Sequence, residues 1–434
     1  MPPVPNELTA VQAALALAEG SLSAERLAAT CLDRIAERDP LLHAWTAVDA
    51  AGTLAEARRV DAQRATGPLA GLPVGIKDVI DLRGFPTAMG SPIHAGHRPA
   101  TDASCVALLR KAGAIFPGKT ATTELAFVGR NRTANPHNPA HSPGASSAGS
   151  AAAVADCMVP LALGTQTASS VTRPAAHCGV AGYKSSLGAF SLAGIKPFAP
   201  SFDCLGGLAR SVEDLMLLRA GLGEGPYRLG LRPARTLPAR IGLCLEPFAG
   251  RCEASATEAV EQVASDLRGA GVTVTEVDLP CPLDRLEEAH KSIMAFEAAR
   301  SYAAEFLQFR GQLSEPLQTL LRQGWECPRK DYLAALAFLA RVRRDFAEGS
   351  AEIGILLTPS ATGEAPPGLE TIGDPICSRP WSLLGVPSVT LPAGRGPAGM
   401  PIGIQLVGQA GQDDTLLLQA HGIEGLLSDL RRGG

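Results

Sequence analysis

The spacing of hydrophobic residues predicts helices at the start of the chain. Over residues 7–65 the apolar positions recur at helical intervals, as Leu27, Cys31 and Ile35 do, which places them on one face of a helix. We expect this helix to end at Pro40, because the residue before a proline is biased away from helical geometry.

The pattern changes to that of a buried strand at residues 71–82 (GLPVGIKDVIDL), with Lys77 in the strand or just beyond it. A helical spacing returns at 102–112, and a short strand is expected at 114–116. Further strands are predicted at 241–245, 272–277, 353–357, 388–391 and 402–407, and helices at 253–269 and within 283–348. Helical segments therefore separate many of the predicted strands.

This alternation predicts an α/β fold with a mixed central sheet covered by helices on both faces. We find no internal repeat, and residues 228–238 are typical of a surface crossover and not of a linker. We therefore expect one large domain over residues 1–434, with helices at 7–65, a core at 71–220 and a C-terminal α/β part at 239–430.

Composition narrows the possible functions. A hydrophobic content of 46% with 19% charged residues is typical of a globular protein with a large core, and a net charge of −4 argues against nucleic-acid binding. Neither a signal peptide nor a membrane span is expected. The ten cysteines contain no C-x-x-C pair and the eight histidines form no Cys/His cluster, so we expect free thiols, no metal, no cofactor and a cytoplasmic location.

Residues 113–120 (GAIFPGKT) match the G-x-x-x-x-G-K-[ST] pattern of a phosphate-binding loop. That mechanism needs a strand before the first glycine and a flexible loop between the two glycines. Here a helix is predicted before Gly113, and the residues between the glycines are apolar. We therefore expect Lys119 to have a structural role and no nucleotide to bind.

The segment 142–179 is the most informative part of the chain for chemistry. Nearly all its side chains are small, and it contains serines at positions 142, 146, 147, 150, 169 and 170. Such a run is uncommon in a soluble domain unless the backbone must approach another group closely. Serines beside tight backbone indicate nucleophilic chemistry, which requires a base and an oxyanion hole.

The identity of the base stays open on local sequence alone. The G-x-S-x-G motif of α/β-hydrolases is absent, and neither His141 nor His177 has a carboxylate partner that the sequence suggests. Lys77 is the other candidate, because burial lowers a lysine pKa towards the working range. The alternative, which the local sequence favours, is an ion pair of Lys77 with Asp78 or Asp81.

Several motifs together resemble the amidase signature family. They are GLPVGIKDVIDL, NPHNPAHSPGASSAGSAAA, PLALGTQTASSVTRPAAHCGVAGYKSS, DPICSRPWSLLGVPSVTLPAG and GMPIGIQLVG, and the resemblance extends from about residue 7 to 420. Through GTQT and SVTRPA the chain looks most like malonamidase-type amidases, which act on small substrates. The resemblance implies the amidase signature fold, a Ser-cisSer-Lys amidohydrolase and a homodimer.

The resemblance also implies site residues. Ser170 matches the nucleophile, Ser146 the bridging serine that follows a cis peptide bond, and Lys77 the base; the serine spacing of 24 is the one that the family requires. In this scheme a proton passes from Ser170 through Ser146 to neutral Lys77. Ser147 and Ser150 would support these residues by hydrogen bonding. Backbone N–H groups of Thr167, Ala168, Ser169 and Ser170 would stabilise the oxyanion.

The chain departs from the family pattern next to the nucleophile. Ala168 and Ser169 replace a Gly-Gly pair, Ala145 replaces a glycine, and Ser185 replaces the proline of K-P-[ST]. Glycine would allow a positive φ and close approach of a carbonyl group. These differences put the level of activity in question, and leave the fold unaffected.

Arg173 gives the best indication of substrate. It either binds a substrate carboxylate in a bidentate manner or forms a structural contact, such as a clamp on a backbone carbonyl. Arg130 and Arg132 are weaker candidates. Asp203 and Arg210 match family positions that we expect to support the core.

Three functions follow from these observations. The first is hydrolysis of the C–N bond of a small, carboxylate-bearing amide through an acyl-enzyme on Ser170, with no nucleic-acid or membrane partner. The second is the amidase subunit of a tRNA-dependent amidotransferase. The third is a catalytically impaired amidase-fold protein used for binding, which Ala168 and Ser169 suggest.

Overall fold

The computed structural model describes residues 4–128, 132–231 and 233–433. At its centre the described part of the chain forms an 11-stranded sheet in the order β1-β3-β2-β4-β6-β5-β10-β11-β9-β7-β8. β2 runs parallel to β3 and β4, and β7 runs parallel to β8 and β9, whereas the other pairs are antiparallel. The strands are β1 (Trp45–Val48), β2 (Val74–Lys77), β3 (Gly118–Thr120), β4 (Leu161–Gln166), β5 (Ala181–Lys184), β6 (Cys204–Ala209), β7 (Arg240–Leu243), β8 (Thr273–Glu276), β9 (Leu356–Pro359), β10 (Ser388–Arg395) and β11 (Pro401–Val407).

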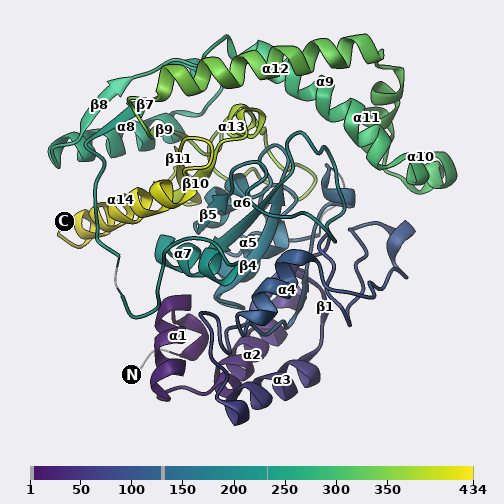
Figure 1. Cartoon of the computed structure of the whole chain (residues 1–434), viewed down its shortest axis with the longest axis vertical. Helices are drawn as coiled ribbons and strands as arrows, with labels where there is room; N and C mark the ends of the chain where they lie inside the picture. The colour runs from purple at the N-terminus through teal and green to yellow at the C-terminus, as the bar shows by residue number, and fades with distance from the viewer. Residues whose placement is uncertain (1–3, 129–131, 232, 434) are drawn as a thin grey trace.

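Helices surround this sheet. Figure 1 shows α1–α3 beside the N-terminus at one end of the molecule and α9–α12 as an arm along the opposite end. The helices are α1 (Ala10–Glu19), α2 (Ala24–Leu42), α3 (Ala50–Gln63), α4 (Ser104–Lys111), α5 (Ala148–Ala155), α6 (Thr172–Cys178), α7 (Val212–Gly221), α8 (Ala254–Gly269), α9 (Leu283–Ser301), α10 (Ala303–Phe309), α11 (Glu315–Glu326), α12 (Arg329–Ser350), α13 (Arg379–Leu384) and α14 (Asp413–Gly433). None of the described helices is long and apolar enough to cross a membrane.

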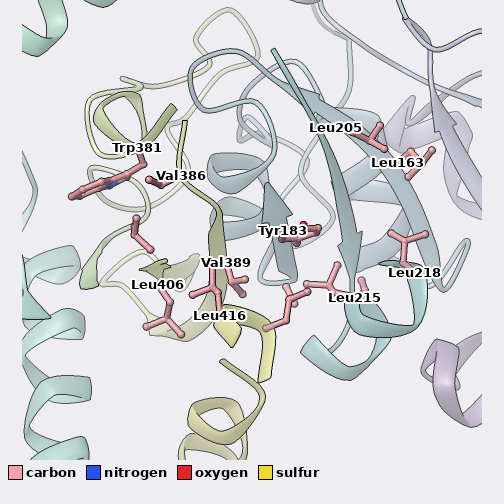
Figure 2. Close-up of a cluster of buried hydrophobic side chains, with 14 of the residues drawn as sticks. Leu163, Tyr183, Leu205, Leu215, Leu218, Trp381, Val386, Val389, Leu406 and Leu416 are labelled. Atoms are coloured by element: carbon pink, nitrogen blue, oxygen red, sulfur yellow. The ribbon is translucent and has the colours of Figure 1, made fainter. Parts of the chain in front are cut away.

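Both faces of the sheet are buried, as the mixed α/β fold predicts. Successive residues of β4 point to opposite faces: Leu163 packs in the cluster that includes Leu215 of α7, and Ala162 packs with Ala152 of α5 and Ala175 of α6. Figure 2 shows the first of these clusters, where side chains of α7 and α14 meet the central strands. The small residues of the second cluster allow α5 and α6 to lie close to the sheet.

Two predicted boundaries are wrong. The strand expected at 114–116 is β3, at Gly118–Thr120, while Ile115 makes only an isolated bridge to Pro73. Pro73 and Pro117 have no N–H group, so they cannot extend the hydrogen bonding between strands at residues 114–117. Strand β1 instead pairs with Gly118–Thr120, and the strand forms there. Helix α2 continues through Pro40 to Leu42. The proline removes one backbone hydrogen bond, and only two helical residues follow it, so the disruption is confined to the last turn.

Four strands were not predicted. β1 lies inside the segment 7–65 that was expected to be helical, β4 lies within the small-residue segment 142–179, and β5 and β6 follow that segment. Each is short and pairs with residues distant in sequence, so local periodicity contains little information about it. The helix before Gly113 and the structural role of Lys119 are confirmed: Lys119 Nζ lies 2.8 Å from Thr87 Oγ1 and 3.2 Å from Asp78 Oδ1.

Candidate active site

Lys77 is the last residue of β2, the third strand from one edge of the sheet, and is fully buried. Its Nζ atom lies 2.8 Å from Ser146 Oγ, 2.9 Å from Thr165 Oγ1 and 3.2 Å from the Thr165 carbonyl oxygen. A neutral amine has two N–H donors and one lone pair. Nζ lies within donor distance of all three oxygens; in the neutral form its two N–H donors would be directed to Thr165 and its lone pair would accept the Ser146 hydroxyl proton.

The electrostatic surroundings favour the neutral amine. Burial lowers the pKa of Lys77 to about 7, opposed by the negative charge of Asp203. The ion pair that the local sequence favoured is not formed, because Asp78 contacts Lys119 instead. Asp81 lies 3.7 Å from His97 Nε2. Lys77 therefore has the environment of a base, which the fold and not the neighbouring sequence creates.

The first serine cluster precedes α5 and is buried. Ser147 Oγ donates to the Thr165 carbonyl at 3.3 Å, and Ser150 Oγ donates to the Leu163 carbonyl at 2.9 Å. Both bonds attach the start of α5 to β4, the supporting role that the resemblance implied. All peptide bonds between described residues are trans, so the cis bond expected at Ser146 is not observed. The trans chain nevertheless places Ser146 Oγ beside Lys77.

Ser170 lies in the loop between β4 and α6, and its carbonyl oxygen accepts a 3.2 Å hydrogen bond from Ser147 N. Gln166, which the sequence analysis did not identify, organises this loop. Its Oε1 accepts from the backbone N–H groups of Val171 and Thr172 at 2.8 and 3.0 Å, and its Nε2 donates to the Ala168 carbonyl at 3.2 Å. One side chain thus holds both ends of the loop.

The residues that replace family glycines fit this loop without strain. Ala168 and Ser169 are not among the described residues with positive φ, and neither is Ala145. The N–H groups of Ala168, Ser169 and Ser170 have no hydrogen-bond acceptor within the described part of the chain. The loop therefore needs no glycine at these positions, and its N–H groups remain available to a ligand.

Asp203 supports the same loop from β6's N-terminal side. Its Oδ1 accepts the Thr167 hydroxyl at 2.6 Å, and its Oδ2 accepts the N–H groups of Phe198 and Ala199 at 2.7 and 3.0 Å. Asp203 is therefore both a structural support, as expected, and the charge that acts on Lys77. Arg210 donates to backbone carbonyls that include Val154 and Val159, which agrees with its expected core role.

A cavity of about 320 Å³ opens onto residues 167–171, the loop that contains the predicted nucleophile Ser170 and is called the nucleophile loop below. Ser170 and Arg173 line it, and Ser146 and Lys77 are buried. Its other lining residues are Ala126, Phe127, Val128, Thr167, Ala168, Ser169, Phe198, Lys291, Met294, Leu320, Gln323, Ile372, Gly373, Pro375 and Arg379. The cavity is therefore mainly apolar, with cationic side chains at a few positions.

Arg173 forms the backbone clamp that was one of its two predicted roles. Its Nη1 donates to the Gly373 carbonyl at 2.5 Å, while its Nε has no partner among the described residues. Burial lowers the pKa of Arg173 to about 9, so the guanidinium remains charged at neutral pH. It makes no ion pair with a described carboxylate within 4.0 Å. Arg173 thus places a charged, buried side chain in the cavity wall.

Two further cations line the cavity, and the sequence analysis did not identify them. Arg379 Nη1 lies 2.9 Å from Glu287 Oε1, and Lys291 Nζ lies 2.7 Å from the same oxygen. Glu287 neutralises one of these two charges. With Arg173, the cavity therefore has a net positive wall, which favours an anionic group on a ligand.

The other predicted candidates do not contribute a base or a second anion site. His177 is buried and its pKa falls to about 3, while His141 Nδ1 lies 2.8 Å from the Ala365 carbonyl. Arg132 is exposed away from the cavity lining, and Arg130 lies outside the described residues. Within the described residues, no group of three or more metal-ligating side chains is assembled.

His290 is a further residue that sequence did not reveal, since it lies within the predicted helical segment 283–348. It is fully buried on α9, and its Nε2 lies 3.1 Å from the Thr167 carbonyl oxygen. Its ring stacks on Phe202 with a centroid distance of 4.4 Å. Burial lowers the pKa of His290 to about 3, so the ring is neutral and Nε2–H is the donor. The helical arm thus contacts the nucleophile loop directly.

The fold and this arrangement define an amidase. The family model "Amidase" matches residues 26–417, and the chain belongs to the amidase signature family, as the motifs predicted. The likeness to malonamidases in particular stays a prediction.

The similarity to known proteins extends over nearly the whole chain. A glutamyl-tRNA(Gln) amidotransferase subunit from Roseiflexus castenholzii is 34% identical, over 95% of this chain and 94% of the relative. A crystal structure of an amidase superposes with a TM-score of 0.88 at 30% identity, covering 96% of this chain and 99% of the other. The native peptide amidase of Stenotrophomonas maltophilia has a TM-score of 0.83 at 28% identity, covering 98% of each chain.

Proposed function

We propose that this amidase hydrolyses a small amide that bears an anionic group, with Ser170 as nucleophile, Ser146 as relay and Lys77 as base. The observation that carries the proposal is the 2.8 Å contact between Ser146 Oγ and the buried Nζ of Lys77. A lysine with a pKa of about 7 is largely neutral above that pH, as proton acceptance requires.

The chemistry follows from the order of these groups. Ser170 Oγ attacks the amide carbon while its proton passes to Ser146 Oγ, and the Ser146 proton passes to Lys77 Nζ. Lys77 then returns a proton through Ser146 to the leaving nitrogen, which departs as ammonia or an amine and leaves an ester on Ser170. Water cleaves the ester by the same relay in reverse.

The loop between β4 and α6 supports an oxyanion hole. The N–H groups of Ala168, Ser169 and Ser170 are fixed by the hydrogen bonds of Gln166 and are unoccupied by described acceptors. Preorganised donors of this kind stabilise the charge that develops on the amide oxygen. Removal of one such donor typically costs about 10²-fold or more in rate.

The proposed substrate class rests on the cavity. Its volume of about 320 Å³ and its apolar lining suit a small molecule, and the Nε of Arg173 has no partner among the described residues. Arg173 also lines this cavity, so its guanidinium is placed to donate to a substrate carboxylate while Nη1 keeps the clamp on Gly373. Lys291 and Arg379 add positive potential on the same wall.

Ammonia release from matched pairs of small amides, one with a carboxylate and one without, tests this proposal. We expect Ser170→Ala to abolish turnover on both and to prevent labelling by a fluorophosphonate, which intact-protein mass reports. Arg173→Ala should raise KM chiefly for the carboxylate-bearing member. An equal loss on both members would contradict the substrate class, and labelling of Ser170→Ala would contradict the nucleophile.

A second candidate function is the amidase component of a tRNA-dependent amidotransferase. The relative from Roseiflexus castenholzii bears the name of such a component and is 34% identical to this chain. The net charge of −4 gives no support for direct tRNA contact. Glutamine hydrolysis that is stimulated by Glu-tRNA(Gln), ATP and partner subunits would favour this function over independent hydrolysis of small amides.

The resemblance also implies a homodimer, which light scattering after size exclusion would test.

A further inference from the structure

Two of the ten free cysteines lie side by side next to the cavity wall. Cys252 precedes α8 and Cys377 precedes α13, and their Sγ atoms are 3.4 Å apart. No other cysteine pair in the described part of the chain lies within hydrogen-bonding distance. The two residues are 125 positions apart in sequence, so only the fold brings them together.

The surroundings distinguish the two thiols. Cys252 is partly exposed, whereas Cys377 is buried with 1% exposure. The hydrogen bond from Cys377 lowers the pKa of Cys252, and the same contact together with burial raises the pKa of Cys377. The thiolate is therefore favoured at Cys252, the more exposed of the two residues, and the buried Cys377 sulfur lies 3.4 Å from it.

We infer that Cys252 and Cys377 are an oxidation site that closes to a reversible disulfide and tethers one wall of the active-site cavity. With a hydroperoxide as oxidant, the Cys252 thiolate attacks the O–O bond, becomes a sulfenic acid and releases water or an alcohol. The Cys377 sulfur then attacks the sulfenic sulfur and releases water. Two thiols lose two electrons and two protons, and the peroxide is reduced.

The tether acts on the cavity because of where Cys377 lies. The segment 372–379 contains Gly373, which accepts the hydrogen bond of Arg173, and Arg379, which lines the cavity. Gln405 Nε2 of β11 already donates to the Cys377 carbonyl at 3.3 Å. Closure from 3.4 Å to a bond of about 2.0 Å adds a covalent link from this segment to the start of α8.

Peptide mapping of peroxide-treated protein tests the inference. Trypsin isolates Cys252 in peptide 252–268 and Cys377 in peptide 345–395, and neither peptide contains another cysteine. We expect these two peptides joined, with a mass two hydrogens below their sum, and separated by dithiothreitol. Cys252→Ser should eliminate the joined species. Cys327→Ser, which removes another partly exposed thiol, should leave it unchanged.

The tether has its own readout, which needs no catalytic activity. Amide hydrogen exchange in segment 372–379 should slow several-fold on oxidation of the wild type and recover on reduction. Cys252→Ser should show no such change. Oxidation of Cys252 to a sulfinic acid without a cross-link, or its pairing with a different cysteine, would overturn the site. Unchanged exchange in a cross-linked protein would overturn the tether.

Discussion

The role of Lys77 can be tested through stability as well as through activity. Lys77→Met keeps a long side chain at this fully buried position and removes the amine. We expect the variant to have no amidase activity, because Ser146 then has no proton acceptor. The more specific expectation concerns the free energy of unfolding, which should respond to the substitution with opposite sign at low and high pH.

The magnitude follows from the lowered pKa of Lys77. Its pKa is about 7 in the fold and about 10.5 in the unfolded chain, a difference that corresponds to about 5 kcal/mol of unfavourable free energy at pH 7 and below. Between these two pH values the unfolded state binds one more proton. Wild-type stability therefore rises by about 1.4 kcal/mol per pH unit until the penalty vanishes near pH 10.5.

The substitution also removes three hydrogen bonds, which cost roughly 1 kcal/mol each. Lys77→Met should consequently stabilise the protein by about 2 kcal/mol at pH 6 and about 1 kcal/mol at pH 7, be neutral between about pH 8 and 9, and destabilise it by about 2 kcal/mol at pH 10. Urea unfolding followed by tryptophan fluorescence from pH 6 to 10 measures this difference. Titration of other groups cancels when the two proteins are compared.

Lys111→Met is the matched control, because Lys111 is an exposed lysine at the end of α4. Its difference from wild type should not depend on pH over this range. A stability difference between wild type and Lys77→Met that stays constant from pH 7 to 10 would refute the reasoning. It would mean that Lys77 keeps its proton in the folded protein and cannot act as a base at neutral pH.

Three further predictions concern the residues around the nucleophile loop. Asp203→Asn removes the charge that raises the pKa of Lys77, so the acid limb of the kcat/KM profile should move to lower pH; a shift to higher pH would contradict this electrostatic role. His290→Phe removes the donor to the Thr167 carbonyl, and we expect kcat to fall about tenfold with little change in KM or in circular dichroism. Ser169→Gly should not raise kcat and should lower stability by up to about 1 kcal/mol in urea unfolding, because Ser169 has an ordinary φ.

Much of the fold class could be predicted because periodicity is local. Helix α8 was predicted within one residue of its observed start, and β11 was predicted as 402–407 against Pro401–Val407. The predictions failed where pairing decides the structure. β3 forms at Gly118–Thr120 because β1 pairs with it there, and a short segment contains no record of its distant partner.

The sequence alone also determined which residues are candidates for the chemistry. Ser146 and Ser170 lie in one stretch of small residues, and the motif around Lys77 is contiguous, so their chemical types and spacing can be read directly. Local sequence nevertheless favoured the wrong partner for Lys77, an adjacent aspartate. Adjacent residues on a strand point to opposite faces, so proximity in sequence is a poor guide to an ion pair.

Only the tertiary structure decided what surrounds these candidates. Burial of Lys77 against Thr165 sets its pKa, and a long-range contact from α9 brings His290 to the nucleophile loop. The pairing of Cys252 with Cys377 likewise exists only in the folded chain. Desolvation and contacts of this kind depend on packing between distant segments, whereas residue type and spacing are properties of the linear sequence.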